Sequence, residues 1–206
     1  PKEASFVVKA YEEFTLQSAT SIAERFGRDL DHISRVSSVA LEIYDKMKKL
    51  HGYKLRERTL LQVSAILQDI GKYVNVKNHA LLSYNTITNL DIVGINDHER
   101  LIIATVCYYH NGNIPSMDSP IYNQLSQEDR VMVSKLAAIL QISNAINTSH
   151  SPKFEQVNVN MKNGKLNIYL TTLKNINLEK WAFIAKSKLF REVYGLNATI
   201  IKRGVL

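Results

Sequence analysis

The sequence lacks the features that mark several classes of protein. It has one cysteine, Cys107, so it can form no internal disulfide, and the apolar residues around Cys107 predict a buried thiol. No apolar run approaches the roughly 20 residues that cross a bilayer, and no basic, apolar leader opens the chain. We therefore expect a cytoplasmic protein without membrane contact. Because the chain starts at Pro1 rather than at a methionine, we also expect it to be a piece of a longer protein.

Acidic residues are scarce at the C-terminal end. Residues 151–206 hold 10 of the 26 Lys and Arg residues but only 3 of the 19 Asp and Glu residues, whereas the two signs cancel in residues 1–150. The whole net charge of +7 therefore lies in the last 56 residues. A basic unit beside a neutral one favours an anionic partner, and a lysine-rich face that serves only solubility is the alternative.

Residues 1–150 show apolar side chains at helical spacing, which predicts an all-helical domain of six or seven helices. A break in the first helix is expected near Thr15-Leu16. Capping residues are expected at Asp29 or Asp31, at Asn96 with Glu99, and at Ser126.

The spacing changes after Pro152 to the alternation that is typical of strands. Two alternating runs flank Asn163-Gly164, which predicts a β-hairpin. A helix follows, with Trp181 expected in its buried face, and a last strand ends near Ile201. The predicted fold is therefore mainly α: a helical domain over residues 1–150, then a small basic α+β domain (β-β-α-β) over residues 151–206.

The stretch Leu67-Gln68-Asp69-Ile70-Gly71 ends an apolar helical run with a polar pair and a glycine. With histidine in place of Gln68, it would match the centre of a metal-dependent phosphohydrolase of the His-Asp (HD) type. Such a centre also needs an earlier histidine and a late aspartate, because imidazole nitrogen and carboxylate oxygen suit divalent ions. His32 supplies the first, but Asn144 stands where the aspartate is needed.

The order of these motifs resembles the C-terminal half of the exopolyphosphatase / guanosine pentaphosphate phosphohydrolase family, from about residue 18 to the end. The matching pieces are Glu24-Arg25-Phe26, His32-Ile-Ser-Arg-Val, Leu67-Gln-Asp-Ile-Gly, Ser83 through Asn89-Leu-Asp-Ile-Val-Gly-Ile, Tyr108-Tyr-His110, Leu140 through His150, Trp181, and Lys188 through Gly195. Each piece alone is weakly specific, and the resemblance rests on their order and spacing.

The resemblance implies an HD-like helical domain followed by a small α/β domain, which together help to bind a polyanion and support a homodimer. It places catalysis in N-terminal actin-like domains that use Mg²⁺ to hydrolyse polyphosphate or guanosine pentaphosphate. This chain shows no glycine run of the phosphate-binding kind and contains only 8 glycines. We therefore expect it to be an accessory piece that is not itself catalytic, although the parent protein would be a hydrolase.

The chain departs from the metal-bearing HD pattern at several positions. Two amides, Gln68 and Asn144, replace ligands, and aliphatic residues follow His79 where further histidines would stand. We expect a vestigial site without a metal ion, formed by His32, Gln68, Asp69, His79 and Asn144, in which the two amides hydrogen-bond to each other. His32 is the expected partner of Asp69 if that carboxylate is buried, because an unpaired buried charge is costly. His79 and His110 are expected at the surface or at the edge of a pocket.

The basic residues supply the expected binding set. The residues expected to bind the polyanion are Arg35, Lys72, Lys77, His110, Lys186, Lys188 and Arg191. Two other functions compete with polyphosphate binding. A stand-alone HD phosphohydrolase acting on a nucleotide would need a metal ion, and a nucleic-acid-binding module would rest on charge alone, because no zinc-finger spacing is present.

Overall fold

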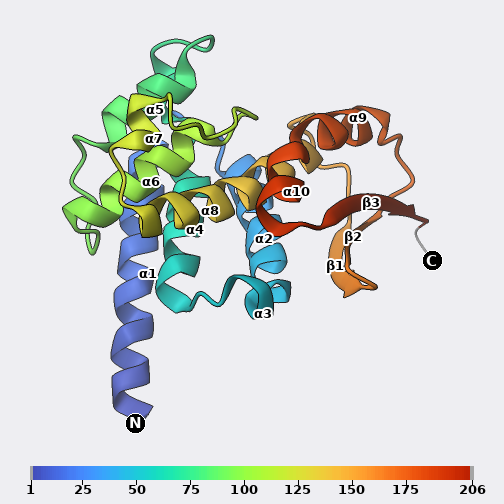
Figure 1. The fold of residues 1–206 in the computed structure, drawn as a ribbon, viewed down its shortest axis with the longest axis horizontal. Helices are drawn as coiled ribbons and strands as arrows, with labels where there is room; N and C mark the ends of the chain where they lie inside the picture. Colours follow the sequence, from blue (N-terminus) through green and yellow to red (C-terminus); the bar gives the residue numbers. More distant parts are fainter. Residues whose placement is uncertain (1, 205–206) are drawn as a thin grey trace.

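The computed structural model describes the backbone of residues 2–204 and the side chains of residues 6–204. Helix α1 (Lys2–Arg25) is continuous, and its N-terminal half extends away from the other helices (Figure 1). The predicted break near Thr15 is wrong. The hydroxyl of Thr15 donates to the backbone oxygen of Tyr11, so the β-branched side chain is accommodated inside the helix.

Seven further α-helices and one 3₁₀ helix complete the helical part. They are α2 (Leu30–Lys46), α3 (Lys48–His51), α4 (Leu55–Leu67), η1 (Ile70–Tyr73), α5 (His79–Ile87), α6 (Asp97–Tyr109), α7 (Pro120–Asn123) and α8 (Gln127–Ile146). The predicted caps are confirmed: Asp29 accepts from the backbone of His32, Asn96 and Glu99 cap each other's backbone, and Ser126 accepts from the backbone of Asp129.

Helix α8 forms the centre of the molecule. Its C-terminal half is buried on all sides, from Leu136 to Ile146. It packs against α2, α4 and α6 of the helical part, and against α9 (Asn177–Lys186) and α10 (Lys188–Tyr194) of the C-terminal part. Burial on every side is typical of a helix in a protein core. The functional consequence is that polar residues at its C-terminal end, such as Asn144, are held rigidly.

The C-terminal part contains β1 (Gln156–Lys162), β2 (Lys165–Thr171), α9 (Asn177–Lys186), α10 (Lys188–Tyr194) and β3 (Asn197–Arg203). The hairpin is confirmed: β1 and β2 are antiparallel, and Asn163 and Gly164 both have positive φ in the turn. Strand β3 lies parallel to β2 after the helical crossover, giving the order β1-β2-β3 (Figure 1). The mainly helical fold with a small sheet is therefore confirmed, and the division into two domains at residue 150 stays a prediction.

The expected burial of Trp181 is wrong. Trp181 is 72% exposed and its neighbour Ile184 is 75% exposed, whereas Ala182, Phe183 and Glu179 form the buried face of α9. Glu179 is buried because it pairs with Lys153 at 2.9 Å. A glutamate in the sequence indicates a solvent-facing position, whereas Glu179 is buried. The buried face of α9 therefore lies about one residue further along the chain than the sequence predicts. Among the described residues, no helix is long and apolar enough to cross a membrane.

Candidate functional site

A cavity of about 170 Å³ lies between the starts of α2 and α5, the ends of α4, α6, α8 and α9, and η1. Its eleven lining residues are all polar: four histidines, three asparagines, two lysines, one threonine and a single carboxylate, Asp69. The stretch at the end of α4 therefore delivers Asp69 into a pocket, as the sequence indicates. Sequence reasoning did not place Asn111, Asn147, Thr148 or His150 in this pocket, because they follow helix ends and carry no spacing signal.

Gly71 brings α5 close to the end of α4. Its backbone N–H donates to the hydroxyl of Ser83, and that hydroxyl donates to the backbone oxygen of Gln68. A Cβ on Gly71 would lie 2.2 Å from the backbone oxygen of His79. Only glycine permits this approach, and the approach places His79 beside Asp69.

Gln68 and Asn144 form a reciprocal amide pair, which confirms the predicted contact. Gln68 Nε2 donates to Asn144 Oδ1 at 3.0 Å, and Asn144 Nδ2 donates to Gln68 Oε1 at 2.6 Å. Both side chains are buried. The pair joins α4 to α8 without an ion, because each amide supplies one donor and one acceptor.

We predict that Gln68→Leu destabilises the protein by about 1–3 kcal/mol, because it leaves the buried amide of Asn144 without a partner. The double variant Gln68→Leu/Asn144→Leu should recover part of this loss, since neither side chain then carries a polar group. Urea unfolding of the single and double variants measures the difference. Equal losses in both would contradict the role of the amide pair.

Asp69 is paired with three cationic or imidazole groups. Lys72 Nζ lies 2.7 Å from Oδ2, while His110 Nε2 and His79 Nε2 lie 3.2 Å and 3.5 Å from Oδ1. Burial alone would raise the pKa of Asp69, but His110 and Lys72 outweigh it and hold that pKa well below its ordinary value. The carboxylate therefore stays charged, and the expectation that His32 would be its partner is wrong.

His32 instead stacks on His150, with the ring centres 4.1 Å apart. Arg35 donates to the backbone oxygen of His150 and so fixes the stack from the same helix. His32 is buried, and its Nδ1 atom has no hydrogen-bond partner among the described residues. Burial, together with the neighbouring His150, lowers the pKa of His32 to about 4.

We predict that His32 makes the protein less stable as the pH falls from about 6.5 to about 4. The groups that act on its charge are His150, Arg35, Asp69 and Asp29. Within this window the unfolded chain binds a proton at His32 that the folded chain does not, so stability rises with pH. The contribution is roughly 3 kcal/mol or less, from a pKa that changes from 6.5 to about 4. This destabilisation by His32 is complete below about pH 4 and absent above about pH 6.5.

Urea unfolding between pH 4 and pH 8 tests this prediction. His32→Gln should show a shallower loss of stability than the unchanged protein in the acid range, and the same trend above pH 7. Parallel curves over the whole range would show that His32 does not titrate on unfolding.

The seven expected binding residues fall into three groups. Lys72, His110 and Lys186 line the cavity, although Lys72 comes from η1 and Lys186 from the end of α9. Burial lowers the pKa of Lys186, which Asp69 partly offsets. Arg35 reaches the cavity only through its bond to His150. The other three, Lys77, Lys188 and Arg191, are exposed and do not line the cavity.

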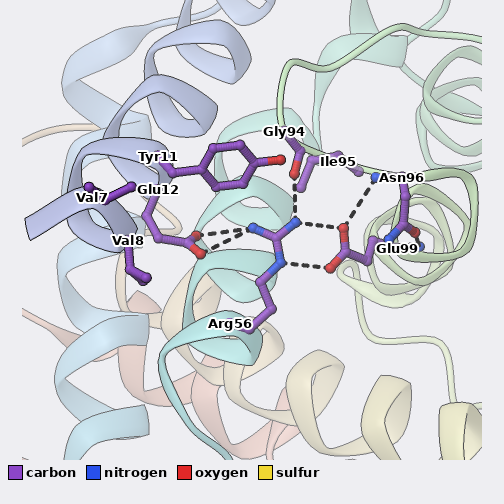
Figure 2. Close-up of a pocket in the computed structure, with 9 residues that line it drawn as sticks. All are labelled: Val7, Val8, Tyr11, Glu12, Arg56, Gly94, Ile95, Asn96 and Glu99. Atoms are coloured by element: carbon purple, nitrogen blue, oxygen red, sulfur yellow. Dashed lines mark hydrogen bonds and ion pairs between the residues drawn. The ribbon is translucent and has the colours of Figure 1, made fainter. Parts of the chain in front are cut away.

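A larger cavity of about 620 Å³ lies beside α1, away from these residues. Figure 2 shows the guanidinium of Arg56, one of its lining residues, between Glu12 of α1 and Glu99 of α6. All three guanidinium nitrogens donate to these carboxylates or to the backbone oxygen of Gly94. Arg56 is therefore already bound within the protein, so the smaller cavity is the better candidate site.

One comparison with known proteins bears on this site. A family model described as Ppx/GppA phosphatase, domain III, matches residues 16–189. The matched range begins in α1, ends in α10 and contains every residue that lines the smaller cavity. The resemblance indicated by the sequence motifs is confirmed. The chain belongs to the Ppx/GppA phosphatase family, in which it corresponds to domain III.

Proposed function

We propose that this chain is the accessory part of an exopolyphosphatase-type enzyme, where it binds polyphosphate and supports dimerisation without itself catalysing hydrolysis. The observation that carries the proposal is the polar cavity, in which Lys72 and Lys186 meet four histidines around one carboxylate. Lysine and histidine donate charge-assisted hydrogen bonds to phosphate oxygens. Asp69 is already neutralised by Lys72, which leaves Lys186 as a cation for an anionic ligand.

A long polyanion would also reach outside the cavity. Lys188 and Arg191 lie on the exposed side of α10, two and five residues beyond Lys186 in the chain. Lys77 lies between η1 and α5, close in sequence to Lys72. Such scattered surface cations act together on a chain of phosphates as they do on a nucleic-acid backbone, through many contacts that salt screens.

We expect long-chain polyphosphate to bind and the affinity to fall steeply, by at least about tenfold, between 50 and 200 mM salt. The double variant Lys72→Gln/Lys186→Gln should weaken binding at low salt by about fivefold or more. Isothermal titration calorimetry measures both effects. An affinity that does not change with salt concentration would contradict the proposal.

Lys48→Gln/Lys49→Gln is the matched control. It removes the same charge from α3, which precedes α4, whereas the cavity lies at the other end of α4. If the two double variants lose affinity equally, binding reflects net charge and the cavity has no special part in it.

The rest of the proposal concerns the parent protein. Actin-like domains N-terminal to this chain would hydrolyse phosphoanhydride bonds with Mg²⁺ in the cytoplasm, and this chain would hold the substrate and form a homodimer. Analytical ultracentrifugation of the chain tests the dimer directly.

Two competing functions make different predictions. A nucleic-acid-binding module would bind single-stranded RNA at least as tightly as polyphosphate, which a competition titration measures. A stand-alone phosphohydrolase would hydrolyse a nucleotide in the presence of Mn²⁺ and lose that activity in Asp69→Ala. We expect polyphosphate to displace RNA and the isolated chain to leave nucleotides intact.

A further inference from the structure

Three atoms from three segments converge at the wall of the smaller cavity. They are Asp69 Oδ1, His79 Nε2 and His110 Nε2, and each is a possible metal ligand. The distances are 3.2 Å between His110 and Asp69, 3.5 Å between His79 and Asp69, and 3.2 Å between the two imidazoles. The three residues come from the end of α4, the start of α5 and the end of α6.

The hydrogen bonds of the two imidazoles fix where their protons lie. His79 Nδ1 lies 2.8 Å from the backbone oxygen of Val76, and His110 Nδ1 contacts the backbone oxygen of Cys107. A carbonyl oxygen can only accept, so each Nδ1 atom carries the proton. In a neutral imidazole the Nε2 atom then carries a lone pair.

When both imidazoles are neutral, three acceptors therefore face one another with no proton between them. Asp69 Oδ1 is buried and meets no hydrogen-bond partner in the described part of the chain, although its other oxygen is paired with Lys72. Three lone pairs at this distance repel unless a cation lies among them. Either one imidazole takes up a second proton, or a metal ion occupies the junction.

The geometry favours a metal ion. Ligands about 2.1 Å from a common ion are about 3.0 Å apart at octahedral angles and about 3.4 Å apart at tetrahedral angles. The three distances in the structure lie within about 0.2 Å of this range. Each histidine also donates its other N–H to a carbonyl, which is the usual support of a metal-binding imidazole.

We propose that Asp69, His79 and His110 bind a divalent transition-metal ion of the Zn²⁺ or Co²⁺ class. Two nitrogens and one oxygen favour such ions over Mg²⁺ and Ca²⁺, which prefer oxygen ligands. This site shares Asp69 and His79 with the vestigial HD positions at which the sequence predicts no metal, and it adds His110. His32, Gln68 and Asn144 take no part in it, and the amide pair closes their side of the pocket.

The experiment uses the protein after treatment with a chelator and buffer exchange. Added Co²⁺ is followed by its ligand-field absorption, and Zn²⁺ by isothermal titration calorimetry. We expect saturable 1:1 binding of both ions, with no competition from a large excess of Mg²⁺. His79→Ala and His110→Ala should each weaken binding by at least about tenfold.

His98→Ala is the matched control, because His98 also contacts a carboxylate, Asp129, at 2.9 Å, but on the exposed surface. It should leave the affinity unchanged. Circular dichroism is recorded for each variant, because His110 is buried and its removal is the more disruptive change. The less buried His79 carries the test if His110→Ala fails to fold.

Two results would overturn the proposal. One is the absence of 1:1 binding, or binding that His79→Ala leaves intact. The other is a nuclear magnetic resonance spectrum in which His79 or His110 keeps a proton on Nε2 in the presence of Zn²⁺, which would mean that a proton and not a metal ion joins the three residues. Both results are independent of polyphosphate binding.

Discussion

Arg56→Ala is expected to lower the free energy of unfolding by about 3–5 kcal/mol, because it leaves two carboxylates without their shared cation. Arg56 donates to both oxygens of Glu99 at 2.6 Å and to both oxygens of Glu12 at 3.2 Å (Figure 2). The side chains of Glu12 and Glu99 are only 12% and 15% exposed. Their bonds raise the pKa of Arg56 further above its ordinary value, so its charge is permanent.

The contribution of Arg56 extends beyond one ion pair. Its fifth bond is to the backbone oxygen of Gly94, so a single guanidinium joins α1, the loop before α6, and α6 itself. Lysine could not replace it, since a single ammonium group cannot reach three acceptors in a fixed plane. We therefore expect Arg56→Lys to lose most of the same stability.

Arg58→Ala is the control for Arg56→Ala, because Arg58 lies in the same helix and makes two bonds to one carboxylate, Asp45, at the surface. Exposed ion pairs contribute about 0–1 kcal/mol, so this variant should be nearly neutral. Guanidinium chloride unfolding of the variants measures the losses. Similar values for Arg56→Ala and Arg58→Ala would show that burial of the carboxylates does not matter here.

Gly71→Ala is expected to destabilise the protein by about 3 kcal/mol or more, near the upper end for overpacked sites. The new Cβ would meet backbone atoms 2.2 Å and 2.5 Å away, the oxygen of His79 and the nitrogen of Ser83. Backbone in a helix cannot move aside as a side-chain tip can. Helix α5 would have to shift, which would also separate His79 from Asp69.

Thermal unfolding and the Co²⁺ titration described above measure the two consequences of Gly71→Ala together. Gly204→Ala is the control, since a Cβ there meets no atom of the described residues within 4 Å. An unchanged melting temperature in Gly71→Ala would mean that α5 packs on η1 less closely than described.

Most features that the sequence predicts correctly are local. The capping pair of Asn96 and Glu99 and the turn at Asn163-Gly164 depend on residues within a few positions of each other, so spacing alone identifies them. The amide pair of Gln68 and Asn144 is distant in sequence. It was predicted because the family order placed both residues at one site.

The errors arise where a distant partner changes the environment of a residue. Glu179 is buried only because Lys153, 26 positions earlier, pairs with it, and this turned the expected face of α9 and placed Trp181 wrongly. The carboxylate of Asp69 contacts His79 and His110, which helical spacing cannot bring together because they lie in separate helices. Contacts of this kind, between residues in separate helices, can be identified only once the fold is known.

Lys186 couples ligand binding in the cavity to the packing of the C-terminal part. It is the only described lining residue beyond His150, since the others lie between His32 and His150, and it reaches the cavity because α9 packs on α8. A ligand that contacts Lys186 and the helical residues together therefore stabilises that packing, and firmer packing raises the affinity by the same factor. Ligand binding and the packing of the C-terminal part on α8 are therefore thermodynamically coupled. A protease that cuts between Ile146 and Gln156 should act more slowly on the ligand-bound protein.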